Sequence, residues 1–178
     1  MASNQLMIVI SVLLLLPLAF HSVTAVEDAP SKTVEKNVDV VVEGMVYCQS
    51  CEQLGTWSLA GAEPISAAKV AFVCKDHRDG VSFYKAIETD AHGYFYAQME
   101  GFKMSHNLLD HPLHSCHVKL VSSPLENCNL LSNVNYGLNG SPLRYDNKRL
   151  FGKNYEAVIY AAGPLAFRPA HCTPITHP

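Results

Sequence analysis

Apolar and polar residues alternate along several short stretches of this chain, and that pattern predicts β-strands with one buried and one exposed face. In residues 68–75, four apolar side chains face one way and two lysines face the other. Similar strands are expected at residues 38–48, 81–87, 94–99, 116–121 and 155–160. About seven strands separated by turns predict an all-β fold, either an antiparallel β-barrel or a β-sandwich.

Glycines and turn residues divide these stretches. Gly44 interrupts the first one, and a glycine inside a strand predicts a bulge or a bend. Residues 89–93 form a predicted turn, in which Asp90 bonds the backbone ahead and Gly93 takes a positive φ. No long stretch shows the helical period, so we expect no long helix.

The N-terminal residues follow a different pattern. An apolar run over 6–20 precedes a stretch of small residues, which is typical of a secretory signal peptide over 1–25. A short polar lead over 26–37 is expected next, followed by one β-domain over 38–172 and a C-terminal tail over 173–178. No later apolar run is long enough to span a membrane, so we expect a secreted, extracellular protein.

Six cysteines lie in the predicted domain: Cys48, Cys51, Cys74, Cys116, Cys128 and Cys172. An even number in a secreted chain predicts three disulfides, although the sequence leaves fifteen pairings open. The first two cysteines belong to the segment MVYCQSC, whose spacing also suits a redox pair or half of a zinc site. No helical pattern follows this pair and no second close pair accompanies it, so two separate structural bridges are favoured.

Five segments occur in register with these cysteines: VEGMVYCQSC, AAKVAFVCKD, ETDAHGYFYA, HSCHVKLVSSPLENCN and AAGPLAFRPAHC. Together they resemble the olive pollen allergen and extensin family (Ole e I-like). More narrowly, they resemble the cysteine-containing PAC domain of chimeric arabinogalactan proteins of plant cell walls. The resemblance implies a β-barrel or sandwich with the disulfides Cys48–Cys128, Cys51–Cys172 and Cys74–Cys116.

The resemblance also implies a secreted cell-wall protein without catalytic activity. We expect it to bind wall polysaccharides (pectic galactan, polygalacturonate or arabinogalactan-type glycans), including the O-glycans of hydroxyproline-rich glycoproteins, and to contribute to wall assembly and growth. No cofactor, catalytic residue or nucleic-acid partner is expected, because no catalytic signature is present and the secretory route excludes nucleic acid. A secreted signalling protein that acts through a receptor is the alternative hypothesis.

Aromatic and basic side chains are the candidates for glycan binding. Trp57 is the sole tryptophan, and its position in a predicted loop makes it the best candidate for a ring that stacks on a sugar. Tyr94 and Tyr96 share one strand face and are further candidates, although strand tyrosines often fill a core instead. His117 and Lys119 share a face of another predicted strand and suit an acidic glycan.

Four histidines fall within twelve residues: His106, His111, His114 and His117. One hypothesis is a pH-sensitive anion site, because protonation of the eight histidines after the signal peptide changes the net charge from −3 to roughly +5. Polygalacturonate would then bind more tightly at mildly acidic pH. Metal binding by these histidines is a minor alternative, and histidines without a shared role are a third.

Two further features carry weaker signals. Asn139 begins an N-glycosylation sequon, which Pro142 directly after the sequon makes less favourable. Four basic residues within 144–153 form a patch that suits either pectin carboxylates or simply solvent.

Overall fold

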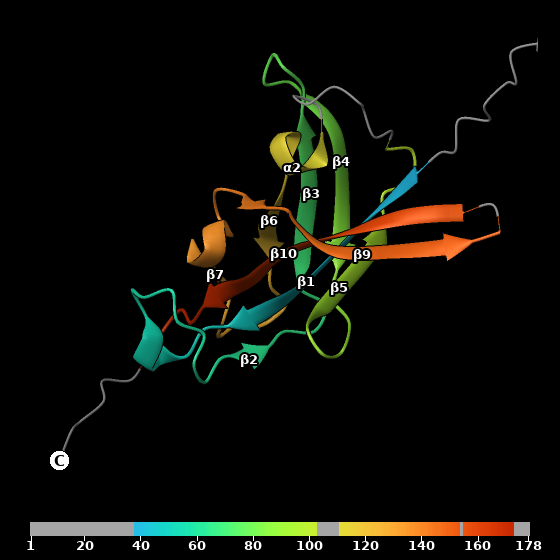
Figure 1. Cartoon of the computed structure of the whole chain (residues 1–178). Helices are drawn as coiled ribbons and strands as arrows, with labels where there is room; N and C mark the ends of the chain where they lie inside the picture. The colour runs from blue at the N-terminus through green and yellow to red at the C-terminus, as the bar shows by residue number, and fades with distance from the viewer. Residues whose placement is uncertain (1–37, 103–110, 154, 173–178) are drawn as a thin grey trace, which may run out of the picture. The chain divides into compact units, whose positions relative to one another are not determined.

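Two β-sheets make up the described part of the chain, which comprises residues 38–102, 111–153 and 155–172 of a computed structural model (Figure 1). The predicted signal peptide, polar lead and C-terminal tail lie outside these residues. The strands are β1 (Val38–Cys48), β2 (Glu63–Pro64), β3 (Lys69–Lys75), β4 (Val81–Glu88), β5 (Tyr94–Gln98), β6 (Cys116–Ser122), β7 (Leu130–Leu131), β8 (Ser141–Pro142), β9 (Arg144–Gly152) and β10 (Tyr155–Arg168).

The two sheets differ in size. The first has the order β2-β1-β10-β7, with β5 paired to β1 and β9 paired to β10. The second has the order β4-β3-β6-β8. In Figure 1 the long strands β1 and β10 run obliquely across β3 and β4.

A shared hydrophobic core lies between the sheets. Val40 on β1 and Phe167 on β10 contribute to it from the first sheet, and Phe72 on β3 and Val118 on β6 contribute from the second. All four side chains are completely buried. The strands β3 and β6 send alternate residues into this core, as the sequence pattern predicted. The all-β fold with a sandwich architecture and three disulfides is therefore confirmed.

The structure departs from the predicted strand arrangement in two ways. The described residues form ten strands, because three two-residue strands add to the long ones. The sequence pattern predicted an antiparallel arrangement, but β1 and β10 pair in parallel. These two strands are buried on both faces, since Val41, Ala157 and Ile159 form a second apolar cluster on the side away from the core. Burial on both faces is typical of parallel strands, and alternation along one strand does not reveal the direction of its neighbour.

A bulge lies in β1 beside Gly44, as the sequence predicted. The register of β1 against β10 shifts between Gly44 and Val46. A Cβ atom at Gly44 would clash with the ring of Phe95 and lie 2.5 Å from the carbonyl oxygen of Ala162. Glycine is therefore required where β5 and β10 both approach β1 closely.

Helical structure in the described residues is limited to short turns: η2 (Cys51–Gln53), α2 (Pro112–Ser115) and η4 (Val134–Tyr136). Within these same residues, no helix is long and apolar enough to cross a membrane.

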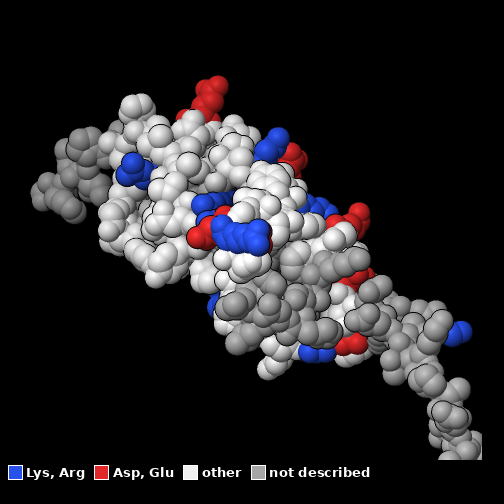
Figure 2. Space-filling view, turned by 90° about the horizontal axis from the view of Figure 1, so that it is seen from above, with Lys and Arg blue, Asp and Glu red and all other residues white. Residues whose placement is uncertain are grey.

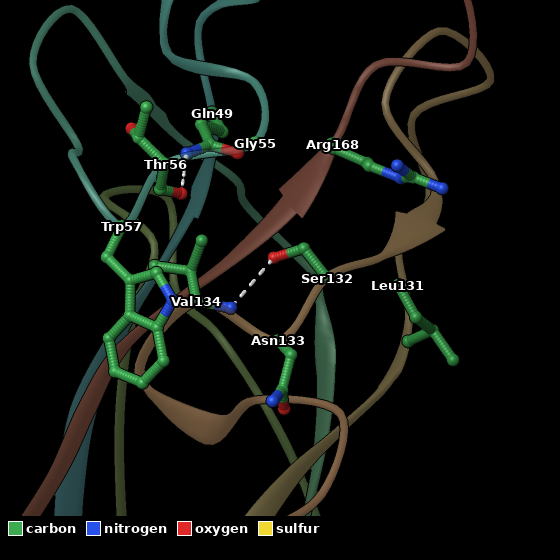
Figure 3. A pocket seen from close by; sticks show the side chains of 9 residues that line it. All are labelled: Gln49, Gly55, Thr56, Trp57, Leu131, Ser132, Asn133, Val134 and Arg168. Carbon is green, nitrogen blue, oxygen red and sulfur yellow. Dashed lines mark hydrogen bonds between the residues drawn. The ribbon is translucent and has the colours of Figure 1, made fainter.

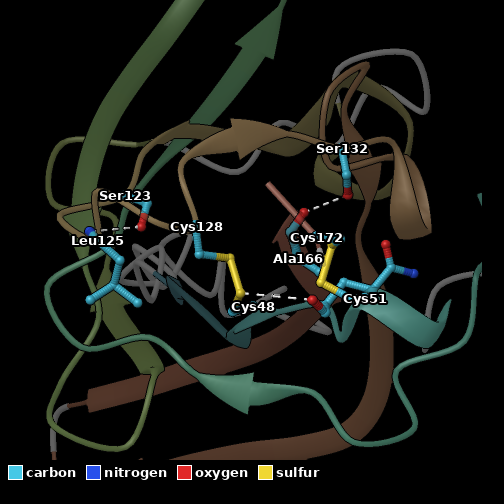
Figure 4. The surroundings of a disulfide bond; sticks show 9 residues. Cys48, Cys51, Ser123, Leu125, Cys128, Ser132, Ala166 and Cys172 are labelled. Atoms are coloured by element: carbon cyan, nitrogen blue, oxygen red, sulfur yellow. Dashed lines mark hydrogen bonds between the residues drawn. A yellow bond between two sulfur atoms is a disulfide. The ribbon is translucent and has the colours of Figure 1, made fainter. Parts of the chain in front are cut away.

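Three disulfides join Cys48 to Cys128, Cys51 to Cys172 and Cys74 to Cys116, which is the pairing that the family resemblance implied. Figure 4 shows the first two of them. The last of these bridges links neighbouring positions on β3 and β6. The other two leave the end of β1 in different directions, one toward the segment before β7 and one toward the chain after β10. The end of β1 is therefore held against two segments that are distant in the sequence.

Candidate functional site

A pocket of about 240 Å³ lies where β1, β7 and β10 end (Figure 3). It is lined by Gln49, Gly55, Thr56, Trp57, Leu131, Ser132, Asn133, Val134 and Arg168. Trp57 is 54% exposed, whereas tryptophan is usually a well-buried residue. An accessible indole beside a concave, partly polar surface marks this pocket as the candidate binding site.

Gln49 organises the loop that carries this tryptophan. Its side chain is buried, and its Nε2 lies 3.0–3.1 Å from the carbonyl oxygens of Gln53, Thr56 and Ser58. A side-chain amide has two N–H groups, so the three acceptors share them. The backbone N–H of Gln49 also donates to the carbonyl oxygen of Phe167 at 2.9 Å. The loop is thus folded around one amide and attached to β10.

The segment after β7 forms the facing wall. Ser132 Oγ donates to the carbonyl oxygen of Ala166 at 2.5 Å and accepts from the N–H of Val134 at 3.3 Å. These bonds attach the segment to β10, whose last residue, Arg168, also lines the pocket. Cys128, just before β7, is tied to β1 by its disulfide. Both walls are therefore fixed by covalent and hydrogen bonds.

Tyr136 packs edge-on against Trp57, with ring centroids 5.0 Å apart and planes at 90°. Tyr136 and Asn135 both have a positive φ, +64° and +48°, and such strain in a bulky residue often marks a functional site. Asn135 Nδ2 donates to the carbonyl oxygen of Pro164 at 2.8 Å, and the Gly140 N–H donates to that of Tyr136 at 2.6 Å. These bonds hold the strained turn, so the exposed aromatic pair is arranged before any ligand arrives.

The predicted pair Tyr94 and Tyr96 lies on the outer face of the first sheet. Phe95, between them, is completely buried in the core, so both tyrosine rings point away from it. Their rings stack, with centroids 6.3 Å apart and planes 29° apart. We call this surface the tyrosine face; it comprises Tyr94, Tyr96 and the polar residues beside them, Glu43, Lys148, Asp39 and Gln98.

Glu43 connects the tyrosine face to β9. It accepts hydrogen bonds from Tyr94 Oη at 2.6 Å and from Lys148 Nζ at 2.5 Å. Burial disfavours the ionised form of Glu43, but these two bonds outweigh it and lower the pKa of the carboxyl group. Burial and the bond to Glu43 raise the pKa of Tyr94. Gln98 Nε2 donates to Asp39 Oδ2 at 3.0 Å nearby, so a row of hydrogen-bonding groups lies beside the stacked rings.

His117 and Lys119 lie on the outer face of the second sheet. Cys116 and Val118, which alternate with them along β6, are buried in the core, so the two basic residues point outward. The structure therefore distributes the predicted glycan-binding residues over three surfaces. It brings the two tyrosines together and the two basic residues together, and Trp57 belongs to neither group.

The described histidines of the predicted anion site contact or are covered by neighbouring residues, whereas His106 lies outside the described residues. His111 Nδ1 accepts from the N–H of Leu113 at 3.3 Å, and its ring packs edge-on against Tyr160. Burial and the neighbouring His114 lower the pKa of His111. His111 therefore protonates below the ordinary histidine pKa of about 6.5.

The pKa of His117 is also lowered. Burial, then Lys119 and Lys75, lower its pKa. Its Nε2 is buried without a hydrogen-bond partner in the described structure. Any histidine switch that uses these side chains therefore needs a lower pH than free histidine does. Among the described residues, no three His, Cys, Asp or Glu side chains are grouped as a metal site requires.

Charged side chains of both signs are interspersed among uncharged ones on the face that Figure 2 shows. Most of the predicted basic patch is paired. Lys148 contacts Glu43, and Arg149 contacts Glu156 at 2.8 Å. Arg144 donates to the carbonyl oxygen of Gly163 at 2.7 Å. The patch therefore offers less free positive charge than its sequence suggests.

Asn139 is exposed, and its backbone N–H donates to Asn133 Oδ1 at 3.1 Å. Ser141 of the same sequon is buried, and its Oγ accepts from the N–H of Gly163 at 3.1 Å. Glycosylation of Asn139 stays a prediction.

Sequence reasoning proposed Trp57 as a binding residue but did not name the residues around it in the structure: Gln49, Asn133, Tyr136 and Arg168. For Gln49 a signal existed, because a polar residue between two disulfide-bonded cysteines has little freedom to move. The other three come from distant segments and carry no local pattern. Only the folded structure reveals that they meet at one place.

No protein-family model matches this chain. Several plant proteins are nevertheless similar to it in sequence. Non-classical arabinogalactan protein 30 of Arabidopsis thaliana is 31% identical over 134 residues, which cover 73% of this chain and 53% of that protein. The pistil-specific extensin-like protein of Nicotiana tabacum is 33% identical over 104 residues, which cover 58% of this chain and 22% of that protein. The chain thus spans about half of the first relative and about a fifth of the second.

A solved structure shows the same fold. The major plantain pollen allergen Pla l 1 superposes with a TM-score of 0.51 over 78% of this chain and 99% of that chain, at 23% sequence identity. The relatives confirm the resemblance that the cysteine-containing segments predicted. This chain is related in sequence to plant arabinogalactan and extensin-like proteins, and it has the fold of a pollen allergen.

Proposed function

We propose that this chain is a secreted plant cell-wall protein that binds wall polysaccharides without catalysis and so contributes to wall assembly and growth. The exposed indole of Trp57 beside a preformed pocket is the observation that carries this proposal. The names of the relatives support the wall location, because arabinogalactan and extensin-like proteins are the proteins to which the chain is similar.

A sugar ring presents an apolar face and a rim of hydroxyl groups, and the Trp57 pocket offers a complement to both. The indole supplies a flat apolar surface, and polar side chains surround it. Because disulfides and hydrogen bonds already hold both walls, little conformational entropy is lost when a ligand binds. The tyrosine face offers a second flat aromatic surface on which further residues of a long polysaccharide can lie.

The composition of the pocket favours binding over hydrolysis. Glycoside hydrolysis normally uses two carboxyl groups that flank the scissile bond. The nine lining residues include no aspartate, glutamate or histidine. A polysaccharide held here would therefore be retained rather than cleaved.

Replacement of Trp57 by alanine tests the proposal. We expect W57A to weaken binding to immobilised galactan, polygalacturonate or arabinogalactan by about tenfold or more, because a central tryptophan commonly contributes that much to a binding site. Affinity electrophoresis or isothermal titration of the oxidised protein measures the change. Y84A is the matched control, because Tyr84 is an equally exposed ring (59%) on the other sheet.

The control should bind as the unmodified chain does. Equal binding by W57A and the unmodified chain would remove the pocket from the mechanism. Failure of the unmodified chain to bind any of the three polysaccharides, with capture by a receptor ectodomain instead, would contradict the proposal and favour a secreted signalling protein.

A further inference from the structure

We infer that the Trp57 pocket selects an acidic sugar, namely a uronic acid residue whose carboxylate pairs with Arg168 while its ring lies against the indole. This inference rests on the proposed function and specifies the class of sugar that the site takes. It follows from the hydrogen-bonding groups that the pocket leaves unused.

Two hydroxyl groups of the lining are already committed. Thr56 Oγ1 donates to the carbonyl oxygen of Gln53 at 2.8 Å and accepts from the N–H of Ser58 at 3.1 Å. Ser132 Oγ has both a donor and an acceptor partner in the wall that it builds. Neither hydroxyl can therefore donate to a ligand without breaking a bond that shapes the pocket.

The groups that remain are mainly donors. Within the described structure, the guanidinium of Arg168, the Nδ2 of Asn133 and the indole N–H of Trp57 make no hydrogen bond or ion pair. Arginine and tryptophan side chains donate only. Figure 3 shows the Arg168 and Trp57 side chains on opposite sides of the pocket. A ligand that complements them must bring acceptors.

A carboxylate fits this requirement best, because it is ionised, accepts only, and matches the planar fork of a guanidinium. Neutral sugars bring hydroxyls, each of which also needs an acceptor. In the described part of the chain, Gln49 Oε1 is the one side-chain acceptor of the lining without a partner, so it suits a single hydroxyl. The unpaired donors and the single unpaired acceptor of the lining therefore complement a sugar with one carboxylate and a few hydroxyls better than a fully neutral sugar.

Charge and size point the same way. The formal net charge of the whole chain is −3 and does not attract a polyanion, so the preference for a carboxylate depends on the charge of the pocket lining alone. No acidic side chain lines the pocket to oppose a carboxylate. The volume of about 240 Å³ is below the roughly 300–1,000 Å³ of pockets for drug-sized ligands, so it suits one sugar residue of a chain.

The sole tryptophan makes the test direct, because fluorescence excited selectively at tryptophan reports on this pocket rather than on the tyrosines elsewhere. Trigalacturonate and its carboxyl-reduced counterpart are titrated into the oxidised protein at low salt. The two probes share linkage and length, and they differ only in having carboxylates or neutral groups. We expect trigalacturonate to bind about tenfold or more tightly than the reduced form, since charge-assisted hydrogen bonds are the stronger ones.

R168Q should remove this preference and leave binding of the reduced form unchanged. R78Q is the charge-matched control, because Arg78 is exposed in the turn between β3 and β4 and lines no part of the pocket. R78Q should keep the preference. Raised salt should also weaken trigalacturonate more than the reduced form.

Equal affinity for both probes would overturn the acidic-sugar inference and leave polysaccharide binding intact. A preference for trigalacturonate that survives in R168Q would overturn the assignment to this pocket. A chain that binds neither probe but is retained on neutral galactan would likewise refute the inference and not the proposed function. No binding to any glycan would refute both.

Discussion

At the scale of single residues, Gln49 shows how one buried amide sets the shape of a loop. It lies between Cys48, which ends β1, and Cys51, which begins η2, and its side-chain Nε2 contacts three carbonyl oxygens of the loop. The indole of Trp57 is presented by this loop. The position of the ring therefore depends on a residue that need not touch the ligand.

We expect Q49A to lower the free energy of unfolding by about 2–3 kcal/mol, because carbonyl oxygens that Nε2 now satisfies lose their donor. Urea unfolding of the oxidised protein measures the loss. The fluorescence of folded Q49A should also shift, because the loop around Trp57 loosens.

The control is Q53A, since Gln53 is only half-buried and its side chain makes one long contact with Thr56, at 3.5 Å. Its effect should stay within about 0.5 kcal/mol. Equal losses in the two variants would mean that Gln49 does not organise the loop.

At the scale of elements, Glu43 links three strands. It lies on β1, and its partners Tyr94 and Lys148 lie on β5 and β9. The bonds that lower its pKa stabilise the ionised carboxylate in the folded state only. This coupling should make the stability of the first sheet depend on pH.

The direction of the pH dependence follows from the lowered pKa. In the unfolded chain this carboxyl takes up a proton near pH 4.5, whereas in the folded chain it does so at lower pH. The stabilisation is thus complete well above pH 4.5 and is lost as pH falls through the folded-state pKa. Urea unfolding between pH 7 and pH 3 should show a steeper acid loss for the unmodified chain than for E43Q.

E52Q serves as the comparison, because Glu52 is exposed in η2. It should keep the acid dependence of the unmodified chain. Parallel pH profiles for E43Q and the unmodified chain would show that the Glu43 network does not link the strands energetically.

At the scale of the whole molecule, two of the three disulfides join segments that line the Trp57 pocket, and the third lies in the other sheet. Cys48–Cys128 and Cys51–Cys172 (Figure 4) attach the end of β1 and the turn after it to the segment before β7 and to the chain after β10. Cys74–Cys116 joins β3 to β6. All three disulfides are therefore expected to stabilise the folded chain, but only the first two are expected to hold the shape of the pocket.

Removal of one bridge at a time should separate these roles. C51S/C172S and C74S/C116S open loops with sequence separations of 121 and 42 residues, and each should lower the free energy of unfolding by about 2–4 kcal/mol. Only C51S/C172S should also weaken glycan binding, because it frees the chain after Arg168. Thermal unfolding and Trp57 fluorescence titration measure the two effects. Equal loss of affinity in both variants would mean that the pocket needs the whole framework.

Several features of the fold followed from the sequence because they are local. Alternating residues on β3 and β6 identified the strands, and Gly44 marked the bulge. Asp90 also behaves as its turn predicted, since its carboxylate accepts from the N–H groups of His92 and Tyr94. Trp57 was proposed for a different reason, because it is the only tryptophan of the chain and lies in a predicted loop.

The remaining features of the site depend on contacts between distant segments. The two tyrosines of β5 had two possible environments, core or surface, until the burial of Phe95 decided between them. Arg168 and Asn133 had no recognisable pattern of their own, and they enter the inference because, among the described residues, their donors stay unpaired at the pocket that Trp57 also lines.

The short strands and the number of bridges could be predicted from the sequence, because strand patterns are local and an even number of cysteines behind a predicted signal peptide favours pairing. The parallel pairing of β1 and β10, and the presence of Trp57, Asn133 and Arg168 in one pocket, became apparent only in the folded chain. The physical reason is that alternation specifies which side of a strand is buried. It does not specify which strand lies next to it, or which side chains remain without partners once the chain has folded.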